Sequence, residues 1–153
     1  MAQVKVHSLF TEFDINLFKA GKHFRLYEKM GSHLVTVDGI DGVYFAVWAP
    51  TAKQVSVIGD FNYWMEGEHQ LNVRWDSSGI WEGFIPNIGK GEVYKYKIQS
   101  NNNDIWTEKA DPFAKYCEHP PNTASIIWTS EHKWKDEAWM GYRKDKNGLD
   151  KPY

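Results

Sequence analysis

Cysteine is nearly absent from this chain, whose 153 residues include one, Cys117. A single thiol excludes an internal disulfide framework and is consistent with a reducing compartment. No apolar run approaches the roughly 20 residues of a membrane-spanning helix. The first residues also lack the apolar core of a secretory signal peptide. We therefore expect a cytoplasmic protein with no membrane partner.

An excess of one charge is also missing, because 18 Lys and Arg stand against 20 Asp and Glu. This balance lacks the basic footprint of a nucleic-acid-binding protein and favours a neutral ligand. The six histidines have no close helical spacing of the kind that holds zinc, and no glycine-rich phosphate loop is present. No pair of carboxylates is selected by its spacing for catalysis. We expect no metal, no cofactor, no catalytic residue and no nucleic-acid partner.

Aromatic residues are abundant, at 16% of the chain with eight tryptophans. A β core accommodates part of this load, because aromatic side chains favour the pleated surface of a sheet. Eight tryptophans are many for one core of this size. Some of them are expected at the surface, where a flat ring offers an apolar platform to a ligand or a partner.

Period-two alternation predicts strands that are separated by short polar turns. The predicted strands are 43–48, 54–58, 80–85, 92–98 and 125–128. In 92–98 the alternation places Tyr94, Tyr96 and Ile98 on one face and Lys95 and Lys97 on the other. Trp48, Trp81 and the two tyrosines are interpreted mainly as core. Strands without intervening helices predict an all-β, immunoglobulin-like antiparallel β-sandwich.

Three segments follow from these patterns. Residues 1–41 are expected to form a helical and extended segment that packs on the sandwich, with a short helix that begins after Thr11 and ends near Gly21. Residues 42–129 are expected to form the sandwich. Residues 130–153 are polar and charged, and are interpreted as a C-terminal linker.

Several motifs resemble one known family. They are GVYFAVWAPTAKQVSVIGDFNYW at 42–64, GIWEGFIP at 79–86, GEVYKYKI at 91–98, KADPFA at 109–114 and PNTASII at 121–127. Together they are similar to the family-48 carbohydrate-binding modules, of isoamylase N-terminal type, found in glycogen branching enzymes. LYEKMGSH at 26–33 and WKDEAW at 134–139 resemble the segments that flank this module in bacterial branching enzymes.

The resemblance implies a module that binds α-1,4-glucans, namely glycogen, starch and maltooligosaccharides, in a parent enzyme of glycogen biosynthesis. Its second partner would be the parent's own catalytic (β/α)₈ barrel. Such a barrel needs about 200 residues or more, so the chain is expected to lack the barrel and to have no activity of its own.

The resemblance also implies three carbohydrate-binding residues. Trp64 and Trp106 match tryptophans that stack on sugar rings, and Lys95 matches a lysine that hydrogen-bonds sugar hydroxyls in related glycogen-binding modules of kinase regulatory subunits. Those modules have an asparagine just before the last strand, where this sequence has Ala124 or Ser125. The residues alone leave two alternatives to sugar binding open. Trp64 would cap the core, and Lys95 would be an ordinary solvated lysine.

Three other functions fit the same sandwich. One is a structural docking domain that buttresses the barrel without binding sugar, to which Trp134 and Trp139 would contribute. Another is a glycogen-sensing regulatory module of a kinase complex. The last is the N-terminal module of a debranching or trehalose-releasing enzyme.

Overall fold

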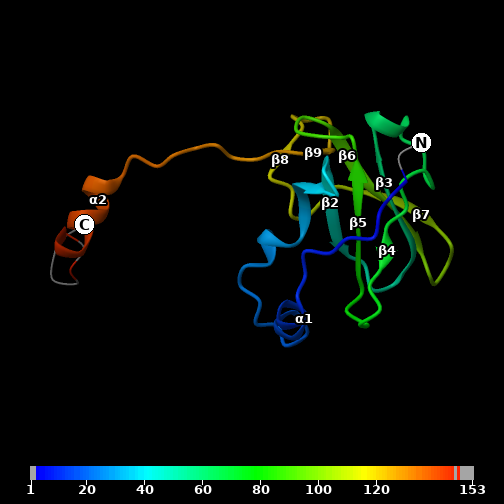
Figure 1. Ribbon diagram of the computed structural model, residues 1–153, viewed down its shortest axis with the longest axis horizontal. Coiled ribbons are helices and arrows are strands. Elements are labelled where there is room, and N and C mark those ends of the chain that lie inside the picture. Colours follow the sequence, from blue (N-terminus) through cyan, green and yellow to red (C-terminus); the bar gives the residue numbers. More distant parts are fainter. Residues whose placement is uncertain (1–2, 147, 149–153) are drawn as a thin grey trace.

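A computed structural model describes residues 3–146 and 148 of the chain. Two antiparallel sheets pack face to face, and a short helix lies outside one of them (Figure 1). This confirms the predicted all-β sandwich with an N-terminal helix. No helix in the described part of the chain is long and apolar enough to cross a membrane.

The first sheet has four strands in the order β1-β2-β5-β4. Their bounds are β1 Gly31–Val37, β2 Ile40–Trp48, β4 Asn72–Val73 and β5 Ile80–Pro86. Strands β1 and β2 form a hairpin whose two turn residues, Asp38 and Gly39, have φ of 53° and 75°. Positive φ at both positions is the geometry that Asp-Gly favours in tight hairpins.

The second sheet has the order β3-β6-β9-β8, and β7 also pairs with β6. The bounds are β3 Ala52–Gly59, β6 Val93–Ser100, β7 Trp106–Lys109, β8 Tyr116–Cys117 and β9 Ser125–Ile126. Strand β9 pairs with Val93 and Tyr94 at the start of β6, while β7 pairs with residues 96–99 of the same strand. Each of the five strands predicted from the sequence overlaps a strand of the structure.

Side chains that alternate along the strands fill the space between the sheets. The buried cluster includes Phe45 from the first sheet and Tyr94 and Tyr96 from the second, with the Phe45 and Tyr94 ring centroids 5.0 Å apart. Both tyrosine hydroxyls donate to the buried carboxylate of Asp111, at 2.6 and 3.1 Å. Burial raises the pKa of Asp111 although these hydrogen bonds lower it.

Helix α1 (Glu12–Lys19) covers the outer surface of the first sheet. Thr11 caps it, because its hydroxyl accepts from the Asp14 amide while the Asp14 carboxylate accepts from the Thr11 amide. Ile15 from this helix is buried with Tyr44 and Ile80 of the sheet. The prediction of a core position for Trp48 is wrong: the residue lies on this outer side, where Phe18 of α1 contacts its ring at a centroid distance of 6.2 Å and leaves it 56% exposed.

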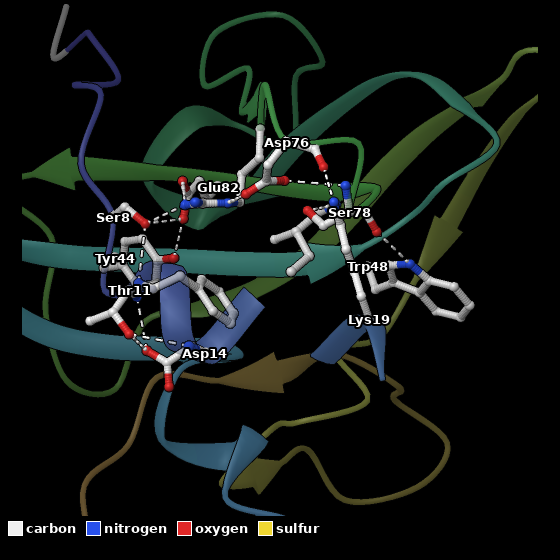
Figure 2. Close-up of polar contacts among 12 residues, drawn as sticks. Ser8, Thr11, Asp14, Lys19, Tyr44, Trp48, Asp76, Ser78 and Glu82 are labelled. Atoms are coloured by element: carbon white, nitrogen blue, oxygen red, sulfur yellow. Dashed lines mark hydrogen bonds and ion pairs between the residues drawn. The ribbon is translucent and has the colours of Figure 1, made fainter. Parts of the chain in front are cut away.

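A polar cluster fastens the N-terminal segment to this sheet (Figure 2). Glu82 accepts hydrogen bonds from Arg74 at 2.6 Å, Tyr44 at 2.5 Å and Ser8 at 2.8 Å. Arg74 also pairs with Asp76 at 2.8 Å. Burial, and then the neighbouring Glu82 carboxylate, raise the pKa of Tyr44 well above its ordinary value. The cluster thus satisfies a carboxylate and a guanidinium that the covering segment takes out of water.

Several elements were not predicted from the sequence. Strand β1 lies within residues 1–41, which were assigned to the leading segment, and β4, β7 and β8 lie in stretches for which no strand was predicted. Helix α2 (Glu137–Lys146) lies in the stretch interpreted as a linker. Figure 1 shows α2 standing apart from the sandwich at the end of an extended stretch.

Candidate functional site

The outer surface of the second sheet carries the candidate site. Because Tyr94 and Tyr96 point into the core, Lys95 and Lys97 point away from it. Directly opposite residues in an antiparallel pair share a face. Trp106 is opposite Gln99 and Glu108 is opposite Lys97, so these β7 side chains lie on the same outer surface. We call this set, Lys95, Lys97, Gln99, Trp106 and Glu108, the open face.

The two lysines of the open face differ in their partners. Lys97 lies between two carboxylates, with its Nζ 3.5 Å from Glu66 and 3.4 Å from Glu108. Lys95 makes no ion pair or side-chain hydrogen bond with any residue that the structure describes. Its side chain is only partly exposed. Lys95 is therefore a half-buried cation whose three N–H groups can all be donated to a ligand.

The turn after β3 carries Trp64. It begins as a 3₁₀-helix, η2 (Asp60–Asn62), and continues through Tyr63 and Trp64 with φ of 55° and 59°. Two consecutive non-glycine residues in this region cost about 1–2 kcal/mol each, so other contacts must hold the turn. The buried Asn62 accepts from the Gly59 amide at 2.9 Å and donates to the Val57 carbonyl at 2.8 Å.

Trp64 itself is held by two hydrogen bonds. Its backbone amide donates to the Gly59 carbonyl at 3.0 Å, and its indole Nε1 donates to the Asp60 carboxylate at 2.8 Å. The ring is only partly buried. Its orientation is therefore fixed by the turn, while one part of the ring stays accessible.

The turn lies on the same side of the sheet as the open face. The Gly67 amide donates to the Ser56 hydroxyl at 3.3 Å, and Ser56 is opposite Lys97 on β3. Glu66 reaches Lys97 from the same segment. The segment 60–67 therefore covers the outer surface of β3 and borders the open face.

The three residues singled out in the sequence thus belong to one side of the molecule. Gln99, opposite Trp106, is four residues beyond Lys95 along β6, which is a separation of about 13 Å. Trp64 lies near the opposite end of β6, where this strand begins. Its amide is hydrogen-bonded to Gly59, which is opposite Tyr94, the neighbour of Lys95. Among the described residues, no hydrogen bond or ring contact joins the three side chains directly.

Ala124 and Ser125, which stand where the related modules have an asparagine, have a structural role here. Ala124 and Ser125 are both buried, and the Ser125 hydroxyl accepts from the Asp111 amide at 2.9 Å. Neither side chain is available to a ligand. The described residues also contain no group of three or more His, Cys, Asp or Glu arranged to hold a metal ion.

Sequence reasoning missed Tyr63, which the turn presents with 86% exposure beside Trp64. The dense Gly, Asp and Asn content of 59–62 signals a turn. The left-handed conformation of the two aromatic residues that follow has no such signal.

The two-sheet antiparallel sandwich is of the immunoglobulin-like class, with one outer surface covered and the other open. Residues 29–114, more than half of the chain, match the family model for carbohydrate-binding module 48 (isoamylase N-terminal domain). The chain belongs to this family.

Curated relatives and solved structures agree with this assignment. The 1,4-alpha-glucan branching enzyme GlgB of Albidiferax ferrireducens is 51% identical over 93% of this chain and 22% of its own length. GlgB of Aromatoleum aromaticum is 48% identical over 100% of this chain and 23% of its own length. The chain therefore spans about a fifth of these relatives. Klebsiella pneumoniae pullulanase complexed with maltotriose is 26% identical, with a TM-score of 0.53 over 74% of this chain and 11% of its own.

Proposed function

We propose that this chain is a non-catalytic module that binds α-1,4-glucans such as glycogen, starch and maltooligosaccharides on its open face. The observation that carries the proposal is Lys95, a half-buried cation that has no ion-pair or hydrogen-bond partner within residues 3–146 and lies between the turn of Trp64 and the strand of Trp106. Membership of a carbohydrate-binding family supports it. So do the activity for which the relatives are named and the maltotriose complex of the pullulanase.

The binding mode follows from the chemistry of the ligand. A glucan has apolar C–H faces and hydroxyl edges. The rings of Trp64 and Trp106 stack on the faces, and the Lys95 ammonium donates to the hydroxyls. Each hydrogen bond replaces one to water, so its net contribution is about 0.5–1.5 kcal/mol. Few groups are involved, and the affinity for a short oligosaccharide is therefore weak, in the millimolar range.

Weak binding suits a module that is part of a longer protein. In proteins of the relatives' length, the module holds a long polymer near the other four fifths of the protein. Several weak binding sites that engage the same polymer together give a higher overall affinity, by multivalency. We propose that those parts carry out the 1,4-alpha-glucan branching for which the relatives are named. Cys117 is exposed and unpaired, which fits the reducing environment of the cytoplasm.

The test is a titration with maltoheptaose followed by tryptophan fluorescence. The variants are Trp64→Gly, Trp106→Ala and Lys95→Ala. Glycine suits the left-handed conformation of residue 64, so the first variant removes the ring and spares the turn. We expect each variant to weaken binding about threefold to tenfold. Cellopentaose, whose linkage is β-1,4, is the ligand control and should bind more weakly.

Lys97→Ala is the matched protein control, because Lys97 lies on the same face but already has two carboxylate partners. Its effect on binding should be less than twofold. The proposal fails if maltoheptaose produces no saturable change at millimolar concentration. It also fails if Lys95→Ala and Lys97→Ala have equal effects.

A second function is favoured by a separate observation, the exposed aromatic residues of the C-terminal stretch. Trp134 is 75% exposed, and Trp139 and Tyr142 of α2 are each more than 40% exposed. These rings provide a docking surface for the rest of a longer protein, as a structural role for the module requires. Substituting both tryptophans with serine should leave maltoheptaose binding unchanged if docking is their function.

A further inference from the structure

A pocket of about 330 Å³ opens at one end of the sandwich, between the η2 turn and the connection from β5 to β6. We call it the end pocket. The residues that line it and matter here are Phe61, Tyr63, Asn87, Ile88, Glu68 and Glu92. Its volume is within the range of small-molecule sites, ~300–1,000 Å³. Trp64, Lys95 and Trp106 are not among its lining residues.

The walls of the end pocket are mostly apolar. Phe61 and Ile88 form the inner wall and pack against the core between the sheets. These side chains are therefore held in place whether or not a ligand is bound. Tyr63, with 86% of its side chain exposed, lies at the rim. Together they provide apolar surface for one flat ligand face and an exposed ring with a hydroxyl group at the entrance.

The two carboxylates of the end pocket are acceptors to which no described residue donates a hydrogen bond. Glu68 and Glu92 are partly buried, and neither carboxylate has an ion pair or hydrogen bond with any residue of the described part of the chain. The Asn87 side chain also has no such partner there. None of the described residues that line the pocket is a lysine or an arginine. An anionic ligand is thus disfavoured, and a ligand that brings several donors of its own is favoured.

We propose that the end pocket is a second α-glucan subsite, which takes one glucose unit. A glucose ring has an apolar C–H face for Phe61, Ile88 and Tyr63, and hydroxyl groups that donate to Glu68 and Glu92. The inference rests on the proposed function. Its link to that function is the turn itself, because consecutive residues place one ring at the pocket rim, Tyr63, and the next ring, Trp64, beside the open face.

The two subsites are separable by paired glycine variants. Residues 63 and 64 both have positive φ, so Tyr63→Gly and Trp64→Gly each remove a ring without straining the turn. The measurement is an NMR titration of the ¹⁵N-labelled chain with maltose. The amides of residues 87–92 report on the end pocket, and those of residues 95–97 and 106–108 report on the open face.

In the wild-type chain, maltose should shift both sets of amides. Tyr63→Gly should weaken the pocket response about threefold to tenfold and leave the open face within twofold. Trp64→Gly should do the reverse. Glu92→Ala should weaken the pocket response by a similar factor, and Glu92→Gln should retain most of it, because the amide oxygen still accepts from a hydroxyl. Glu137→Gln in α2 is the remote control and should change neither response.

The outcomes distinguish this inference from the proposed function. If maltose shifts the open-face amides alone, the end-pocket inference is overturned and the proposed function stands. If it shifts neither set, both are overturned. A cation site is the rival interpretation of the two carboxylates. The inference is overturned if tetramethylammonium shifts residues 87–92 while maltose does not, or if Glu92→Gln abolishes the maltose response as fully as Glu92→Ala.

Discussion

The outer surfaces of the two sheets differ in what covers them. Helix α1 and the N-terminal segment cover the first sheet, where Ile15 packs on Tyr44 and a polar cluster around Glu82 joins the layers. On the second sheet, the segment 60–67 lies over β3, and β6 and β7 carry Lys95 and Trp106 on the open face. The described residues therefore cover the outer surface of the first sheet themselves, while the side chains of the open face stay accessible.

The largest expected effect is on the covered surface. Glu82→Ala leaves Arg74 and the Tyr44 hydroxyl without their shared carboxylate in a buried site. Breaking such a buried pair from one side costs about 3–5 kcal/mol, which urea unfolding measures directly. Glu108→Ala removes an exposed carboxylate of the open face and should cost about 1 kcal/mol or less. If both variants lost the same unfolding free energy, the proposed difference between the covered and the open surface would be contradicted.

The next effect concerns the turn that borders the open face. Asn62→Ala removes the acceptor of the Gly59 amide and the donor to the Val57 carbonyl, both buried. Unfolding free energy should fall by about 2–3 kcal/mol, and the glucan affinity of the open face should fall with it. Asn102→Ala, in the exposed turn before β7, is the matched control and should change stability by less than about 0.5 kcal/mol. If Asn62→Ala keeps full stability, other contacts hold Trp64.

A smaller effect depends on pH. Burial alone would raise the pKa of Asp14, but hydrogen bonds from Thr11 and His23 lower it to about 2. The unfolded value is near 3.9, so the unfolded state takes up the proton first as pH falls. The contribution of the Asp14 carboxylate to the stability of the folded state is therefore fully present above about pH 5 and is lost as pH falls towards 2.

Asp14→Asn should be less stable than the wild type by about 1 kcal/mol at neutral pH, because it weakens the helix cap. The difference should shrink towards zero near pH 2. Urea unfolding at several pH values measures it. A gap that stays constant from pH 7 to pH 2 would show that the charge of Asp14 does not stabilise the cover of the first sheet.

The alternation of side chains predicted β2, β3, β5 and β6 and the direction of Lys95, because both depend on local sequence alone. Strands β4 and β8 have two residues each, which is too short for an alternating pattern of side chains to be recognised. The lack of a partner for Lys95 among the described residues was not predictable, since the carboxylates that pair with Lys97 come from the segment 60–67 and from β7. The exposure of Trp48 was also not predictable from the sequence, because it depends on how α1 packs across the sheet.

The difference between the two surfaces is tested most directly by the reactivity of their lysines. Acetylation rates of single lysine amines are measured by mass spectrometry with and without glycogen. We predict that glycogen slows the acetylation of Lys95 at least about threefold, while Lys22, exposed just beyond α1 on the covered side, reacts at an unchanged rate. Equal rates for Lys95 with and without saturating glycogen, or equal protection of both lysines, would contradict the assignment of the open face.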